Sequence, residues 1–274
     1  MFGIRKGSNG MGSKRPFRFA AFRVVVRKRL YVSGWWGVGS SMMHFLERDL
    51  THVAVATADP AMSETFAEQP AERGLYRRRL KRVFDSAAII AALPIVLPLI
   101  AILALLIRRD GGPVFYYQNR VGRGGKIFRF WKLRSMVVDA EALLEAHLAA
   151  DPAARAEWNA TQKLKDDPRV TRIGRLIRKT SMDELPQLWN VLRGEMSLVG
   201  PRPIMIDQLP LYPGRAYFSL RPGLTGFWQV GDRNETNFAS RAVYDTSYAR
   251  NVSFLTDIAV LFLTIRTVLR GTGY

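Results

Sequence analysis

The adjacent carboxylates of Asp183 and Glu184 are the side chains in this sequence best suited to chemistry. A carboxylate can bind Mg²⁺, and it can also attack phosphorus to form an acyl phosphate. Arg178 and Lys179 stand shortly before the pair, which suits a phosphorylated substrate. The local pattern alone also fits a simpler role, in which the two acids complement the dipole at the start of a helix.

Two loops rich in proline and glycine follow the acid pair, and each carries an arginine. In Gly200-Pro-Arg-Pro203, prolines on both sides of Arg202 restrict the backbone. Arg221 begins the second loop, Arg221-Pro-Gly-Leu-Thr-Gly226. Either stretch can be an ordinary structured loop. Because a guanidinium presents a planar fork to phosphate, two rigid arginine loops after an acid pair indicate anion binding.

Composition excludes much of the chemistry of cysteine and histidine. The 274 residues include no cysteine, which rules out disulfides, cysteine metal sites and a thiol nucleophile. The three histidines are His44, His52 and His147. A multi-histidine metal site or a Ser-His-Asp triad is therefore not expected, and an Asp or Glu is the expected acid, base or nucleophile.

Helix-capping and turn residues predict the helices and strands that position the acid pair. Ser181 followed by Glu184 is a capping-box pattern, which predicts a helix from Met182 to Arg193 with Gly194 as its stop. A helix N-terminus attracts phosphate, so the pair would lie where an anionic substrate approaches. The neighbouring sequence predicts strands at 114–117 and 126–134, a glycine-rich turn at 121–125, and helices at 138–150, stopped by Pro152, and at 170–179.

An uncharged apolar segment at residues 86–107 is long enough for a membrane helix. Basic residues flank it at 77–82 and 108–109, so the positive-inside rule is best satisfied when both ends face the cytoplasm. Pro94 and Pro98 interrupt the backbone near its centre. We expect a re-entrant helix rather than a crossing, with a buried core helix as the alternative. The basic flanks would bind anionic lipids.

A second apolar stretch, residues 254–269, is interrupted by Asp257 and Arg266. Its apolar side chains fit either an interfacial helix or the protein core.

The formal net charge of +18 is unevenly distributed along the chain. The first 30 residues hold nine Lys or Arg and no acid, whereas residues 31–74 hold six acids and two arginines. We expect residues 1–75 to form a disordered extension, and a misassigned translation start before Met42 would explain residues 1–41.

The ordered motifs of residues 78–274 resemble those of the bacterial sugar transferase family. These enzymes are monotopic polyprenyl-phosphate phosphoglycosyl transferases, which start the assembly of exopolysaccharides and glycans. Among the subgroups, the sequence looks most like the short exopolysaccharide initiators that transfer a hexose phosphate, especially of galactose or glucose. The matching motifs are Lys81-Arg-Val-Phe-Asp85, Gln118-Asn-Arg-Val-Gly122, Phe130-Trp-Lys-Leu-Arg-Ser-Met136, residues 181–194, Ser197-Leu-Val-Gly-Pro-Arg-Pro203, Arg221-Pro-Gly-Leu-Thr-Gly226 and the Asp245–Tyr248 region.

The resemblance implies roles for individual residues. Asp183 and Glu184 correspond to the family's catalytic dyad, with Asp183 as nucleophile close to Mg²⁺ and both acids as metal ligands. Pro98 falls on the break of the family's re-entrant helix, and Leu97 replaces the serine that precedes it in some members. The candidates for binding phosphate or substrate are Arg178, Arg202, Arg221, Lys132 and Asp245.

The resemblance also implies a two-step reaction. Asp183 attacks the sugar-bearing phosphate of a UDP-sugar, UMP leaves, and undecaprenyl phosphate then takes the phosphosugar. Mg²⁺ would offset the charge of the diphosphate. We expect the enzyme at the bacterial inner membrane with its active site on the cytoplasmic face, handing its product to downstream glycosyltransferases.

The expected fold is α+β and mostly helical, a membrane-anchored monotopic domain with an N-terminal, Pro-broken re-entrant helix and a small β element. We divide the chain into an extension at 1–75, a basic flank and re-entrant helix at 76–110, and a catalytic domain at 111–274.

Two other functions remain alternatives. A non-catalytic membrane scaffold of the polysaccharide machinery would be expected to lose the acid pair or the arginine loops, and both are intact. A basic nucleic-acid-binding protein leaves the apolar segment unexplained, so we expect no nucleic-acid partner.

Overall fold

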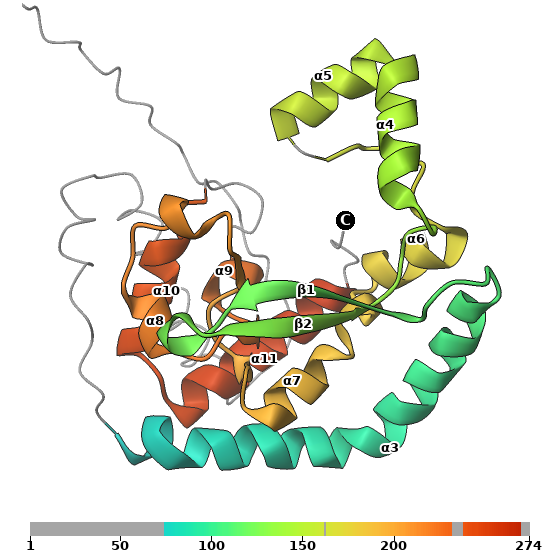
Figure 1. The fold of residues 1–274 in the computed structure, drawn as a ribbon. Coiled ribbons are helices and arrows are strands. Elements are labelled where there is room, and N and C mark those ends of the chain that lie inside the picture. Colours follow the sequence, from blue (N-terminus) through green and yellow to red (C-terminus); the bar gives the residue numbers. More distant parts are fainter. Residues whose placement is uncertain (1–73, 162, 232–237, 270–274) are drawn as a thin grey trace, which may run out of the picture. The chain divides into compact units, whose positions relative to one another are not determined.

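A computed structural model describes residues 74–161, 163–231 and 238–269 (Figure 1). The predicted extension at 1–75 therefore lies outside the described residues, apart from its last two. The helical segments are η1 (Tyr76–Leu80), α3 (Lys81–Arg108), η2 (Arg123–Gly125), α4 (Ala140–Ala150), α5 (Pro152–Thr161), α6 (Arg172–Lys179), η3 (Met182–Glu184), α7 (Gln187–Arg193), η4 (Leu209–Leu211), α8 (Ala216–Ser219), α9 (Phe227–Val230), α10 (Arg241–Arg250) and α11 (Phe254–Leu269). The strands are β1 (Phe115–Val121), β2 (Ile127–Leu133), β3 (Ser197–Val199), β4 (Ile204–Met205) and β5 (Gly223–Thr225).

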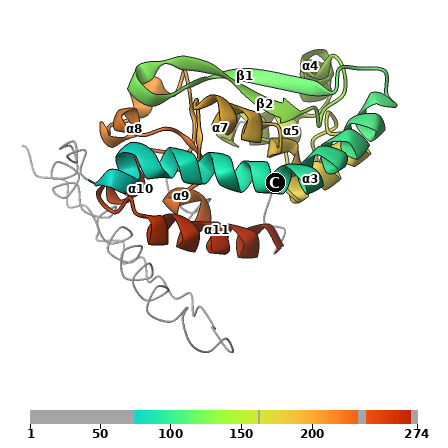
Figure 2. The ribbon, with the colours of Figure 1, turned by 90° about the horizontal axis from the view of Figure 1, so that it is seen from below.

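Helix α3 carries the predicted apolar segment. Among the described residues, Tyr76–Arg108 is long and apolar enough to cross a membrane. Large apolar side chains such as Ile95 and Leu105 are at least 70% exposed on it, which is costly in water and favourable in lipid. Figures 1 and 2 show that α3 changes direction along its length, and Pro94 and Pro98 lie inside it. These features are compatible with a membrane-anchored domain.

Both ends of α3 are fastened to the remainder of the protein. Near the N-terminal end, buried Asp85 accepts hydrogen bonds from Ser197 Oγ at 2.6 Å and from the backbone N–H of Leu198 at 3.4 Å. At the C-terminal end, Arg134 pairs with Asp110 and donates to the carbonyl of Ile107. The apolar middle of the helix is thus held between two polar anchors.

The antiparallel hairpin of β1 and β2 positions the candidate site. Its register pairs Tyr116 with Lys132 and Arg120 with Phe128, and β4 adds to the other edge of β1 to give the order β2-β1-β4. Side chains alternate between faces, so Lys132 lies on the same face as Phe128 and Phe130, both buried. The predicted hairpin is confirmed, although β1 continues to Val121 rather than ending at Tyr117.

Asn190 of α7 pairs with the free edge of β2. Its Oδ1 accepts the backbone N–H of Trp131 at 3.3 Å, and its Nδ2 donates to the carbonyl of Arg129 at 2.7 Å. Asn190 is fully buried. Its amide therefore satisfies backbone groups that a sheet edge would otherwise leave without partners.

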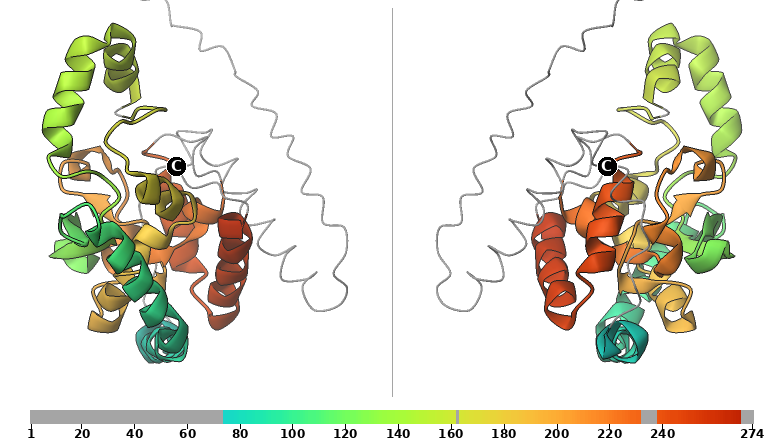
Figure 3. Two further views of the ribbon diagram at one scale, coloured as in Figure 1. Left: turned by 90° about the vertical axis from the view of Figure 1, so that its right-hand side faces the viewer. Right: turned by 90° about the vertical axis from the view of Figure 1, so that its left-hand side faces the viewer.

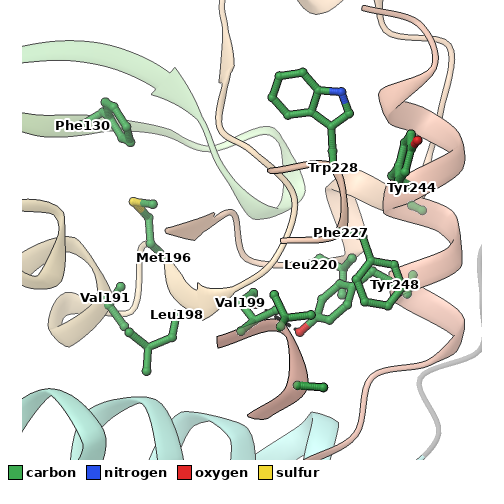
Figure 4. Close-up of a cluster of buried hydrophobic side chains, with 14 of the residues drawn as sticks. Phe130, Val191, Met196, Leu198, Val199, Leu220, Phe227, Trp228, Tyr244 and Tyr248 are labelled. Carbon is green, nitrogen blue, oxygen red and sulfur yellow. Dashed lines mark hydrogen bonds between the residues drawn. The ribbon is translucent and has the colours of Figure 1, made fainter. Parts of the chain in front are cut away.

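The main core lies between the hairpin, α7, the parallel pair β3–β5 and helices α9, α10 and α11. Figure 4 shows Phe130, Met196 and Tyr248 among its apolar side chains, with the Tyr248 hydroxyl donating to the carbonyl of Val199. A side chain at Gly223 would place its Cβ 2.1 Å from the backbone nitrogen of Gly200, so the two glycine-bearing loops can meet only without side chains there.

Three predicted helices differ from those observed. The predicted helix 182–193 is instead the single 3₁₀ turn η3 followed by α7, because Pro186 has no N–H to donate and forms the N-cap of α7. The capping box was wrong: Ser181 has φ 56° and its side chain makes no capping bond. Gly194, at φ 80°, ends α7 as predicted.

Pro152 ends the predicted helix 138–150 but also begins α5, since proline is tolerated in the first helical turn. The predicted helix 170–179 starts two residues later, where Thr171 caps α6 and Val170 instead bridges to Met136.

Helix α11 spans the apolar stretch 254–269, and part of it packs into the core as one of the two expectations held. Ala259 and Val260 are buried in the core, while Leu255, Phe262 and Ile265 are exposed. Figures 2 and 3 show α11 beside α3, and Phe254 packs edge-on against Phe84 of α3. One face of α11 thus belongs to the core, and the opposite face presents apolar side chains outward.

Candidate active site

Lys132, Asp183 and Glu184 form an acid–lysine cluster beneath the hairpin. The Nζ of Lys132 lies 3.0 Å from Asp183 Oδ2 and 3.0 Å from Glu184 Oε1. Asp183 is buried, with 7% of its surface exposed. The structure therefore brings together two acids and a lysine that are about 50 residues apart in the sequence.

Short, rigid elements hold the three side chains. Lys132 comes from β2, where its ammonium lies 5.7 Å from the ring centre of Phe130. The two acids lie on the turn η3, which follows Ser181 in a left-handed conformation. Because that conformation is unfavourable for a residue with a side chain, the turn is a specific feature of the fold and not a frayed helix end.

Arg178 is placed next to this cluster by the packing of α6. Its Nε donates to Ser135 Oγ at 2.8 Å, and Asp183 contributes to its electrostatic environment. Gly174 permits this approach, because a Cβ there would lie 1.9 Å from the carbonyl oxygen of Ser135. The close contact between α6 and the segment after β2 thus sets the position of Arg178.

Further arginines lie near Glu184. Arg202 Nη2 is 3.8 Å from Glu184 Oε1. Arg120 is close enough to both Arg202 and Glu184 to be affected by their charges, and it stacks over Phe130 at 5.3 Å. The positive charge of Arg202 also acts on Arg241, whose guanidinium lies 4.1 Å from the ring centre of Trp228.

Arg120 and Arg241 were not among the site residues predicted from the sequence. A signal existed for Arg120, because it stands in the motif Gln118-Asn-Arg-Val-Gly122, whereas the position of Arg241 depends on the packing of α10. Within the part of the chain that the structure describes, the buried Nε atoms of both arginines have no hydrogen-bond partner. Buried donors of this kind suit the oxygens of an anionic ligand.

Burial dominates the electrostatics of the cluster. It raises the pKa of Asp183 above the usual range of an aspartate, and the negative charge of Glu184 adds to that, while Lys132 and Arg178 oppose it. Burial likewise lowers the pKa of Arg178 and of Arg120. The guanidinium groups remain cationic at neutral pH. The site thus combines a carboxylate whose charge is poorly solvated with several fixed cations.

Asp245 lies in a separate buried network. It accepts a hydrogen bond of 2.7 Å from the hydroxyl of Tyr212, and burial raises its pKa to about 7 despite Tyr212 and Arg241. The link from Asp245 to the candidate site runs through Arg241, so its predicted contact with substrate or phosphate stays a prediction.

Arg221 is not brought to the acid–lysine cluster. Its Nε donates to the carbonyl of Gly194 at 2.9 Å, at the C-terminal end of α7, whereas the two acids precede the N-terminal end of the same helix. The predicted role of Arg221 in binding phosphate therefore concerns a different part of the surface.

The acid pair is compatible with a magnesium ion. Within the described residues, no group of three or more His, Asp or Glu side chains could hold a metal. Mg²⁺, however, is commonly bound through one or two carboxylates together with substrate phosphates. Asp183 and Glu184 supply such a pair, so the residues present fit the ion that the sequence analysis expects.

Comparison with known proteins identifies close relatives. A UDP-galactose-lipid carrier transferase of Erwinia amylovora is 51% identical over 198 residues, which are 72% of this chain and 42% of that protein. An undecaprenyl-phosphate galactose phosphotransferase of Salmonella typhimurium is 50% identical over the same shares. The exopolysaccharide production protein ExoY of Rhizobium meliloti is 45% identical over 196 residues, which are 70% of this chain and 87% of that protein.

The chain thus spans less than half the length of the first two relatives and most of the length of ExoY. The family model described as bacterial sugar transferase matches residues 76–271, which include α3, the hairpin and the acid–lysine cluster. With this match over most of its length, the chain belongs to the bacterial sugar transferase family.

Proposed function

We propose that this protein is a phosphoglycosyl transferase that moves a sugar 1-phosphate from a UDP-sugar to undecaprenyl phosphate. The observation that carries the proposal is the acid pair, with Asp183 buried, held by Lys132 among arginines. A site for phosphoryl transfer needs a nucleophile close to fixed positive charge, and this cluster supplies both. The printed names of two relatives, which refer to UDP-galactose and to undecaprenyl phosphate, support the substrates.

In the first step, an oxygen of the Asp183 carboxylate attacks the sugar-bearing phosphorus. The bond between that phosphorus and the bridging oxygen breaks, and UMP leaves with the bonding electrons. In the second step, a phosphate oxygen of undecaprenyl phosphate attacks the same phosphorus and releases the Asp183 carboxylate. The product is undecaprenyl-diphospho-sugar, and the enzyme returns to its starting form.

The cations around Asp183 have distinct tasks in this scheme. Lys132 keeps the Asp183 carboxylate oriented and favours its ionised form, which is the nucleophile. Arg178 is close to Asp183 and Arg202 to Glu184, so both can stabilise charge that develops on phosphate oxygens. Arg120 and Arg241 extend the positive surface beyond Arg202 and would bind the phosphate that becomes part of UMP.

Mg²⁺ would be held by Asp183 and Glu184 and, when bound, would neutralise charge on the diphosphate. Glu184 would then orient the ion or the nucleophile. Lys132 already bridges both acids, so it keeps them close together before substrate arrives.

The membrane arrangement follows from α3. We propose that α3 enters one leaflet and returns, with Pro94 and Pro98 responsible for its change of direction. Both basic ends would then face the cytoplasm at the bacterial inner membrane, and residues 76–110 would anchor a catalytic domain of residues 111–274. Such an anchor lets a lipid phosphate and a soluble nucleotide sugar reach one site in turn. Downstream glycosyltransferases would receive the product.

The nucleophile is tested with Asp183→Asn in the purified full chain, supplied with labelled UDP-galactose and then with labelled UDP-glucose. Unsubstituted protein should retain label covalently when undecaprenyl phosphate is omitted. Asp183→Asn should retain none, and UMP release should fall by about 10³-fold or more. Asp166→Asn makes the same chemical change on an exposed turn and should behave like the unsubstituted protein.

Retention of label by Asp183→Asn at a near-normal rate would show that another residue is the nucleophile. A protein that releases no UMP with any UDP-sugar would favour the non-catalytic scaffold. Cysteines introduced at positions 75 and 112 should both react only from the cytoplasmic side, whereas labelling from opposite sides would replace the re-entrant helix with a crossing.

A further inference from the structure

A second cationic region lies near the start of α3, outside the acid–lysine cluster. It is a cavity of about 210 Å³, which we call the basic cavity. Five Lys or Arg side chains and one Asp contribute to its lining. These charged residues are Arg77, Arg78, Lys81, Arg123, Arg221 and Asp85.

Several of these cations are held in place by the fold. Arg77 donates to the carbonyl of Ala249 at 2.8 Å and to Ser219 Oγ at 3.1 Å. Lys81 pairs with the buried carboxylate of Asp257 at 2.5 Å, and Arg221 donates to the carbonyl of Gly194. Two of these contacts are to neutral carbonyl groups, which fix the direction of a guanidinium without cancelling its charge.

The carboxylate in the lining of the cavity belongs to Asp85. Asp85 accepts from Ser197 Oγ and from the N–H of Leu198, so its oxygens are engaged with β3. Around Arg221, burial together with the positive charges of Arg123 and Arg82 lowers the pKa of the guanidinium, and Asp85 only partly opposes them. An anion in the cavity would relieve this repulsion.

The basic cavity is distant from the acid–lysine cluster. Arg123 lies in the turn between β1 and β2, and Lys132 lies six residues beyond Lys126 along β2, which corresponds to about 20 Å of strand. Helix α7 also separates the two regions, with Arg221 bonded beyond its C-terminal end and the acid pair before its N-terminal end. One phosphate group cannot contact both.

We propose that the basic cavity binds a phosphate group other than those that react at Asp183. Its place at the charged start of α3, directly before the apolar segment, is the level at which phospholipid headgroups lie beside a membrane-anchored helix. The group comes either from an anionic phospholipid or from free phosphate in solution, and the guanidinium groups recognise the same oxygens in both.

Matched variants distinguish binding in the basic cavity from non-specific attraction of an anion to a positively charged surface. Arg78→Gln and Arg79→Gln change neighbouring exposed residues of η1, but only Arg78 lines the basic cavity. Arg123→Gln and Lys126→Gln likewise change exposed residues of the β1–β2 turn, and only Arg123 lines the cavity. The two pairs come from different elements, so a folding defect in one variant leaves the other pair to decide the result.

The experiment uses the full chain in a non-ionic detergent and has two arms. Native mass spectrometry measures retention of phosphatidylglycerol, with phosphatidylcholine for comparison, and calorimetry measures binding of inorganic phosphate. Neither arm contains a nucleotide sugar, so the outcome does not depend on the proposed reaction.

Arg78→Gln and Arg123→Gln should each weaken binding by about fivefold, and together by tenfold or more, while the partner variants change it little. A loss confined to phosphatidylglycerol identifies the lipid headgroup, and a loss in the inorganic phosphate arm identifies free phosphate. Equal effects of both members of each pair, or no effect of any variant in either arm, would overturn the proposal.

Discussion

The acid–lysine cluster and the basic cavity lie at opposite ends of one hairpin, and they differ in what their carboxylates contact. In the cluster, Lys132 contacts two carboxylates at 3.0 Å each. At the cavity, Lys81 pairs with Asp257, and the oxygens of Asp85 are bonded to β3. The carboxylates of the cluster are thus held by a side chain of the site, whereas those at the cavity also fasten β3 and the start of α3. The comparison separates a site suited to reaction from a site suited to binding.

The largest effect is expected from Lys132→Gln. Loss of the ammonium leaves Asp183 and Glu184 as neighbouring like charges and removes the group that orients the nucleophile, so turnover should fall by about 10²- to 10³-fold. Release of UMP from a UDP-sugar measures it. Lys126→Gln, at the opposite end of the same hairpin, is the control, and equal losses in the two variants would erase the distinction between the two ends.

Two glycines test how rigidly each region is supported. Gly174→Ala places a Cβ 1.9 Å from the carbonyl of Ser135, beside Arg178, and Gly223→Ala places one 2.1 Å from the nitrogen of Gly200, in the loop that follows Arg221. Each variant should lower the free energy of unfolding by about 1–3 kcal/mol, measured by chemical denaturation. Gly174→Ala should slow turnover more than Gly223→Ala does at equal loss of stability, and the reverse order would contradict the assignment of the reaction to the cluster.

Asp245, which interacts with Arg241, allows a test of how stability depends on pH near the cluster. Its pKa is about 7 in the folded protein and near 3.9 in an unfolded chain. The folded state therefore binds this proton more tightly, and the resulting stability is complete below about pH 4 and lost as the pH rises through 7. Asp245→Asn should raise the free energy of unfolding at pH 8 by up to about 4 kcal/mol.

The gain from Asp245→Asn should be less than half as large at pH 5, where the carboxyl of the unsubstituted folded protein is protonated. Thermal unfolding at the two pH values measures the difference. A gain of the same size at both would show that the charge of Asp245 is not its cause.

The smallest effect is a shift in the pH profile of turnover. Burial raises the pKa of Asp183, and Lys132 opposes that rise. Turnover should therefore fall on acidification as Asp183 becomes protonated, and the residual activity of Lys132→Gln should fall at a higher pH. A profile that does not move in this variant would mean that Lys132 does not tune the Asp183 carboxyl.

Local signals in the sequence were enough to locate the hairpin, several of the helices and the acid pair. Glycine at 194, the apolar segment before Arg108 and the glycine-rich turn between the two strands each depend on nearby residues, and the structure confirms the elements they predict. Misreadings arose where two local rules compete. Ser181 and Glu184 match a capping box, but Pro186 removes the N–H that a continuous helix would need.

Contacts between distant segments were beyond such rules. Lys132 pairs with the acid pair only because the hairpin packs against η3. Arg241 comes close to Arg202 only through the packing of α10. Arg221 and Arg202 occur in similar loops, yet they reach different regions, because each loop emerges at a different end of α7. Loop composition indicates the kind of ligand but not which site the loop serves.

Asn190 has a consequence for the accuracy of folding. Its amide contacts a donor and an acceptor two residues apart on β2, at Trp131 and Arg129. A shift of β2 by one residue would offer the amide the wrong groups and would turn Lys132 to the opposite face of the sheet. The buried side chain of Asn190 thus favours one register of β2, and only in that register does Lys132 reach the two acids.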